Sequence, residues 1–190
     1  MTGPGGRSQE AVTVPACQEC GFDYEVLDPA DVPAALRSFA KRYRVPLTRF
    51  LRDEDGDALV RQRPAPEVWS ALEYVAHVRD VFASYDGWIH SCLTEDRPVL
   101  EGDGPDDLAV ARKYNEDDPA AVADALAANA ERLAATVEAV PVDGWNRVGM
   151  RRGEERSVCF TARRAVHEGS HHLLDVGRGL RAVRDQRRAP

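Results

Sequence analysis

The chain has 190 residues, of which 43% are hydrophobic and 30% are charged, and its formal net charge is −7. This size suits one globular domain with a single hydrophobic core, and no run of about 18 apolar residues is present that could cross a bilayer. The acidic excess opposes the attraction to phosphates on which nucleic-acid binding depends, so neither nucleic acid nor a membrane is an expected partner.

The N-terminal region divides into two parts. Residues 1–15 are rich in Gly, Pro, Ser and Thr without periodicity, which predicts a flexible tail. They also lack the apolar stretch of a secretory signal, which favours a cytoplasmic protein. Residues 16–26 contain Cys17 and Cys20 in a Cys-x-x-Cys-Gly knuckle that resembles half of a zinc ribbon.

Three interpretations of this cysteine pair remain open. It could be a metal knuckle completed by another side chain or another chain, a redox-active dithiol, or two inert thiols. A closed zinc site needs about four ligands, and no second Cys-x-x-Cys exists, since Cys92 and Cys159 stand alone where small core residues are expected. No recognisable βαβ unit follows the pair, which weakens the redox interpretation.

Four segments have apolar side chains that recur every three to four residues, which predicts four amphipathic helices in residues 27–183. The first begins at Asp31, and Pro46 breaks its pattern. The others are expected at about Pro66–Leu93, Ala120–Val140 and Val158–Val183.

The segments between and after these helices differ in character. Residues 94–119 are acidic and interrupted by Pro and Gly, which predicts a long crossover loop with one helical turn near Lys113. Residues 141–157 predict an extended excursion or a small hairpin, and residues 184–190 a frayed basic tail. The expected fold class is therefore all-α, a four-helix bundle whose cofactor site would lie between facing helices.

Three of the five histidines are candidate metal ligands. His167 and His171 are four residues apart and project from one face of the last helix, while His77 lies midway along the second helix. Neutral imidazole is a common ligand for zinc and similar ions, so these residues predict a three-histidine centre. The alternative is that they are ordinary histidines satisfied by hydrogen bonds. His90 is expected at the surface, and His172 is expected to pack or to orient a ligand.

The same residues match His-Glu-x-x-His, the signature of metallopeptidases in which the glutamate is the general base. A peptidase of this kind needs a third ligand downstream, and only His172 follows His171. Leu174 stands where one extended form of the signature requires glycine. The peptidase is therefore the weaker alternative.

Two motifs together resemble the DinB-like metalloenzyme superfamily, which includes mycothiol-dependent maleylpyruvate isomerase and bacillithiol S-transferases. The first motif is Trp69-Ser-Ala-Leu-Glu-Tyr74 followed by His77-Val-Arg-Asp80, and the second is His167-Glu-x-x-His-His172 followed by Asp175. The resemblance covers roughly residues 30–183.

The resemblance implies an up-down-down-up bundle with a metal bound at His77, His167 and His171. It also implies a low-molecular-weight thiol, mycothiol or similar, as co-substrate against a small electrophile. The metal would be zinc, or else nickel or iron. Such an ion keeps an open position and lowers the pKa of a bound thiol, so the protein need not supply the nucleophile. Two bundles could pair into a homodimer, by analogy alone.

Other polar residues of these helices have expected supporting roles. Four carboxylates could orient the ligating imidazoles: Glu73, Asp80, Glu168 and Asp175. Arg79, Arg112 and Tyr114 could recognise a substrate carboxylate. A metal-dependent S-transferase or isomerase is the leading hypothesis, and a non-catalytic metal-binding module of the stress response is the alternative.

Overall fold

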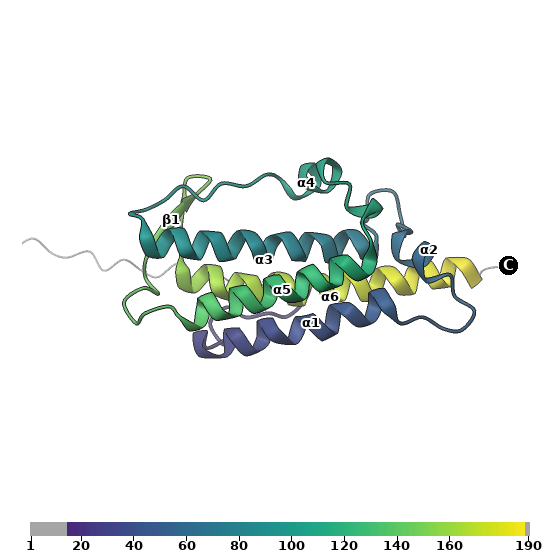
Figure 1. The fold of residues 1–190 in the computed structure, drawn as a ribbon, viewed down its shortest axis with the longest axis horizontal. Helices are drawn as coiled ribbons and strands as arrows, with labels where there is room; N and C mark the ends of the chain where they lie inside the picture. Colours follow the sequence, from purple (N-terminus) through teal and green to yellow (C-terminus); the bar gives the residue numbers. More distant parts are fainter. Residues whose placement is uncertain (1–14, 189–190) are drawn as a thin grey trace, which may run out of the picture.

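The structure is a computed structural model that describes residues 15–188. Its framework is a bundle of α1 (Val32–Thr48), α3 (Ala71–Thr94), α5 (Pro119–Glu138) and α6 (Val158–Arg188). Helices α1 and α6 run in one direction and α3 and α5 in the other, so the order is up-down-down-up (Figure 1). The predicted fold class is confirmed, whereas the tail predicted for residues 1–15 lies outside the described residues except for its last residue.

Short elements connect these helices: η1 (Pro29–Asp31), α2 (Gly56–Arg61), α4 (Pro105–Ala111), η2 (Tyr114–Glu116), β1 (Val148–Arg151) and β2 (Glu154–Ser157). The two strands form an antiparallel hairpin, one of the two alternatives for this segment. Its turn residues Arg152 and Gly153 have φ of 51° and 84°, as a type I′ turn requires. The crossover segment runs along α3 and carries α4 (Figure 1). Within residues 15–188, no helix is long and apolar enough to span a membrane.

A capping box sets the start of α3. The Ser70 hydroxyl accepts a hydrogen bond from the Glu73 backbone N–H at 3.2 Å, and Glu73 Oε2 accepts one from the Ser70 N–H at 2.8 Å. Arg63 Nε donates to the same carboxylate at 2.9 Å. The helix therefore begins after Ser70 rather than at Pro66, and Glu73 holds the helix end instead of orienting a histidine.

Two helix ends differ from the prediction. Helix α1 includes Pro46 in its last turn and ends at Thr48. Helix α6 continues past Val183 to Arg188, because Arg184 Nε donates to Glu54 Oε1 at 2.6 Å and anchors this end to the loop before α2. Residues 184–188 are thus helical rather than frayed.

Helices α1 and α6 approach closely at Gly169. Phe39 and Tyr43 of α1 are fully buried, and Tyr43 Oη donates to the Gly169 carbonyl at 2.7 Å. A Cβ atom on Gly169 would lie 2.6 Å from Phe39 Cε2. The close approach therefore depends on the absence of a side chain at this position.

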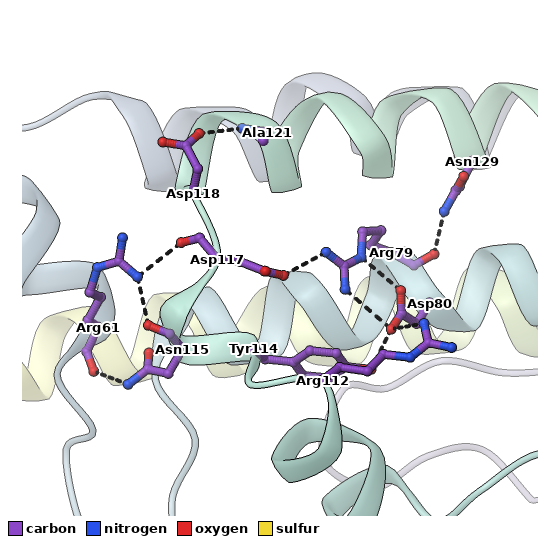
Figure 2. Close-up of polar contacts among 10 residues, drawn as sticks. All are labelled: Arg61, Arg79, Asp80, Arg112, Tyr114, Asn115, Asp117, Asp118, Ala121 and Asn129. Atoms are coloured by element: carbon purple, nitrogen blue, oxygen red, sulfur yellow. Dashed lines mark hydrogen bonds and ion pairs between the residues drawn. The ribbon is translucent and has the colours of Figure 1, made fainter.

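Asp80 of α3 fastens the crossover segment to the bundle (Figure 2). Its carboxylate accepts hydrogen bonds from Arg79 Nε at 2.8 Å, Arg112 Nη1 at 2.8 Å and Tyr114 Oη at 2.6 Å. Burial acts to raise the pKa of Asp80, but the hydrogen bonds from Arg79 and Tyr114 outweigh it and lower that pKa. The groups predicted to recognise a substrate carboxylate bind this carboxylate of the protein itself, and Asp80 orients none of the candidate histidines.

This network should make the stability of the protein depend on pH in acid. Because the pKa of Asp80 is lower in the folded state than the unfolded value of about 3.9, its contribution is present above about pH 4 and is lost as the pH falls below it. We expect Asp80→Asn to lower the free energy of unfolding by about 1–2 kcal/mol at neutral pH. The difference from the wild type should shrink as the pH falls below about 4. Urea unfolding at several pH values measures this, and a difference that stays constant would contradict the assignment.

Candidate metal centre

His77 projects from the middle of α3 toward α6, where it meets His172. The two ring centroids are 4.9 Å apart and the rings are nearly perpendicular, at 86°. Both side chains are largely buried, with exposed fractions of 12% and 17%. The two imidazoles therefore face each other across the interface between antiparallel helices.

Glu168 brings a carboxylate close to both rings. Its Oε2 atom lies 3.2 Å from His172 Nε2 and 3.8 Å from His77 Nε2. Glu168 and His172 are four residues apart, so one face of α6 presents both side chains. The ligand atoms of the three residues lie within 4.8 Å of one another. We call this cluster the His77–Glu168–His172 centre.

Asp175 supports His172 from behind. Its Oδ2 atom lies 3.0 Å from His172 Nδ1, so a proton on Nδ1 leaves Nε2 facing the centre. A carboxylate in this position is usual behind a metal-bound histidine. Burial acts to lower the pKa of His172, but the hydrogen bonds to Asp175 and Glu168 outweigh it and raise the pKa to about 9. A metal ion at Nε2 would therefore displace a proton.

Glu168 is ionised in this environment. Burial acts to raise its pKa, but the hydrogen bonds from His172 and His77 and the charge of Arg164 hold that pKa well below its usual value. Arg164 Nη2 lies 2.6 Å from Oε1, which leaves Oε2 to face the imidazoles. The centre therefore combines one anionic ligand with two imidazoles.

This set of donors fits a divalent metal ion. Two imidazole nitrogens and one carboxylate oxygen are the protein ligands of many catalytic zinc sites, and the same combination serves non-haem iron. Three protein ligands leave at least one coordination position open. A closed structural zinc site would instead use about four protein ligands.

The structure does not bring the three predicted histidines together. His77 lies with Glu168 and His172, whereas His167 and His171 face the segment that precedes α1. The reason is the helical repeat: the pair Glu168 and His172 is turned by about 100° around α6 from the pair His167 and His171. Only Glu168 and His172 face His77 of α3.

The remaining histidine and cysteine predictions have mixed outcomes. His90 is exposed and Cys92 is buried in the core, as expected, while Cys159 is only partly buried. His172 and Glu168 were expected only to support a ligand. Their signal in the sequence is a second i, i+4 pair within the same run, and its face is known only once α6 is packed.

A cleft opens beside the His77–Glu168–His172 centre. A cavity of about 460 Å³ is lined by the three residues of the centre, by Tyr85 and Trp88 of α3, and by residues of the crossover segment around α4. A second cavity of about 320 Å³ shares Tyr85 and Trp88 and extends toward the hairpin. The combined space suits one elongated or two small molecules.

Arg151 of β1 gives the cleft a fixed positive charge. Its guanidinium lies 5.1 Å over the Trp88 ring and donates to the carbonyls of Leu100 at 3.1 Å and Gly102 at 2.9 Å. These contacts hold the group in place without neutralising it. The sequence alone did not single out Arg151, because its position depends on the packing of the hairpin against α3.

The chain is therefore a helical protein of the four-helix-bundle class, with a cluster of potential metal ligands beside a cleft. Residues 45–176 match the family model of the DinB superfamily. The match spans more than half of the chain and includes all three residues of the centre. The chain belongs to the DinB superfamily.

Two solved structures share this fold. YfiT from Bacillus subtilis, described as a probable metal-dependent hydrolase with an unusual four-helix bundle topology, has a TM-score of 0.72 at 14% identity, covering 80% of this chain and 86% of that one. A mycothiol-dependent maleylpyruvate isomerase has a TM-score of 0.63 at 16% identity, covering 81% of this chain and 62% of that one. No curated protein sequence matches the chain. These TM-scores show a common fold, and at identities this low they show the fold alone.

Proposed function

We propose that the protein is a metal-dependent enzyme that uses a low-molecular-weight thiol against a small electrophile, with the ion held by His77, Glu168 and His172. The observation that carries the proposal is the convergence of Glu168 Oε2 with the two Nε2 atoms, at 3.2 and 3.8 Å, on the wall of a cleft. The structural likeness to a mycothiol-dependent isomerase supports the choice of a thiol.

Each residue around the centre has a distinct task. Asp175 fixes the ring of His172, and Arg164 holds Glu168 so that one oxygen faces the imidazoles. Tyr85 and Trp88 line the cleft, and their rings exclude water from part of it. Arg151 is placed to bind an anionic group of a substrate. A divalent ion at the centre would supply the Lewis acid that lowers the pKa of a thiol.

Thiol consumption with mycothiol and chlorodinitrobenzene tests the proposal. We expect turnover that is lost when a chelator removes the metal and returns when zinc is added back. Turnover that is indifferent to chelation would rule out the metal-centred reaction. If the protein binds one metal ion per chain but consumes no thiol with any electrophile tested, the non-catalytic metal-binding module would be favoured.

A hydrolase that uses the same centre is the second candidate, because YfiT is described as a probable metal-dependent hydrolase. Hydrolysis of nitrophenyl acetate without thiol would favour it. The peptidase alternative needs Glu168 as a base beside an ion on His167 and His171, whereas its carboxylate faces His77 and His172. Cleavage of casein by the protein would instead support the peptidase.

A further inference from the structure

A second cluster of metal-type ligands lies between the segment before α1 and the opposite face of α6. It consists of Cys17, Cys20, His167 and His171, whose ligand atoms all lie within 4.8 Å of one another. Cys17 Sγ is 3.6 Å from His171 Nδ1. With zinc at about 2.3 Å from sulfur and about 2.0 Å from nitrogen, tetrahedral donors are roughly 3.3–3.8 Å apart. The four side chains are therefore close to the spacing of a closed zinc site.

The knuckle is folded so that its cysteines face α6. The Gly21 N–H donates to the Cys17 carbonyl at 2.8 Å, and the Cys17 N–H donates to the Phe22 carbonyl at 2.8 Å. Gly21 adopts a φ of +72°, a conformation that favours glycine. This turn brings both thiols to the face of α6 that carries His167 and His171.

His167 is buried without a hydrogen-bond partner. Its exposed fraction is 8%, and neither Nδ1 nor Nε2 has a partner within the described residues. Phe22 and Tyr24 pack on it, each with a ring centroid 5.4 Å away. Leaving a polar atom unsatisfied in such a place costs about 1–3 kcal/mol. A metal ion on one ring nitrogen would remove part of this cost.

His171 is oriented in the way expected of a ligand. Its Nδ1 faces Cys17, while its Nε2 lies 3.5 Å from Glu19 Oε2 and 3.6 Å from Asp175 Oδ2. Metal-bound histidines usually direct their second nitrogen at a carboxylate in this manner. The ring therefore offers one nitrogen to the cysteines and the other to acidic partners.

We propose that Cys17, Cys20, His167 and His171 bind one zinc ion in a closed Cys₂His₂ site, separate from the His77–Glu168–His172 centre. Four protein ligands leave no open position, so the site is structural. It fastens residues 16–24 to α6. A redox-active dithiol would need neither of the two facing imidazoles, and two inert thiols would leave His167 unsatisfied.

The proposed site also bears on the orientation of α6. His167 and His171 immediately precede Glu168 and His172 in the chain, and Asp175 lies near both His171 and His172, at 3.6 and 3.0 Å. A zinc ion bound to His167 and His171 would therefore fix the rotation of the helical turn that presents Glu168 and His172. The zinc site itself stands independently of the proposed function.

Cobalt titration of the full chain, prepared metal-free and without a histidine tag, tests the site. Thiolate bound to Co²⁺ gives a strong sulfur-to-metal charge-transfer absorption that a His–Glu–His centre lacks. We expect the wild type to bind two equivalents, one of them with this absorption. Cys17→Ser combined with Cys20→Ser should lose one equivalent and the whole absorption, whereas the matched control Cys159→Ser should keep both.

His77→Ala separates this site from the catalytic proposal, because it should lose one equivalent and keep the charge-transfer absorption. A wild type that binds cobalt without this absorption would overturn the zinc site, and so would a Cys17–Cys20 disulfide in the protein as purified. If the double cysteine variant does not fold, the wild type and His77→Ala still decide the question. A single equivalent with full absorption in both would support the zinc site and refute the His77–Glu168–His172 centre.

Discussion

Replacing Glu168 with glutamine should empty the His77–Glu168–His172 centre and abolish its turnover. The change keeps the size of the side chain but removes the only negative charge among the three ligands. Groups that merely orient a ligand contribute about 10–100-fold to metal affinity, so we expect the loss of a ligand to exceed about 100-fold. Competition with a chromophoric chelator measures the affinity, and the thiol assay measures turnover.

Glu73→Gln is the matched control for this variant. Glu73 is as buried as Glu168, with exposed fractions of 4% and 8%, but its carboxylate binds Ser70 and Arg63. Glutamine can still complete a capping box, so the start of α3 should persist. Metal affinity should therefore stay at the wild-type value. Equal losses in the two variants would show that burial of a charge, not ligation, underlies the effect.

The bundle was predictable because its signal is local and repeated. Apolar residues such as Leu36, Phe39 and Tyr43 recur at helical spacing, so each turn of the helix places an apolar side chain on the same face. The ends of the helices were less predictable. The contact of Arg184 with Glu54 extends α6, and it joins residues 130 positions apart that no local pattern connects.

The candidate centre was only half predictable for a geometric reason. The run from His167 to His172 contains two overlapping i, i+4 pairs, turned by about 100° from each other, and either pair could face His77. The choice depends on which face the segment before α1 covers. That segment brings Cys17 to His171 across 154 positions of the chain. The knuckle and the histidine pair were each visible in the sequence, but their meeting was not.

Gly169→Val should be the most destabilising single change in the core of α6. The first added carbon would lie 2.6–2.9 Å from three atoms of the Phe39 ring, which is fully buried and cannot move outward. Overpacking of this kind costs about 3 kcal/mol at the upper end of its usual range. For a chain of this size, we expect the melting temperature to fall by about 6–12 °C. Calorimetry measures the change.

Gly177→Val provides the control, since Gly177 lies on the same helix and an added Cβ would meet nothing within 4 Å. Its melting temperature should stay near the wild-type value, because exposed substitutions usually change stability by less than about 0.5 kcal/mol. Similar losses of stability at both positions would mean that helix propensity, not contact with Phe39, sets the cost.

Gly169 lies between Glu168 and His172, so displacing α6 from α1 should also disturb the metal ligands. Weaker metal binding in Gly169→Val alone would therefore connect the packing of α1 to the geometry of the centre.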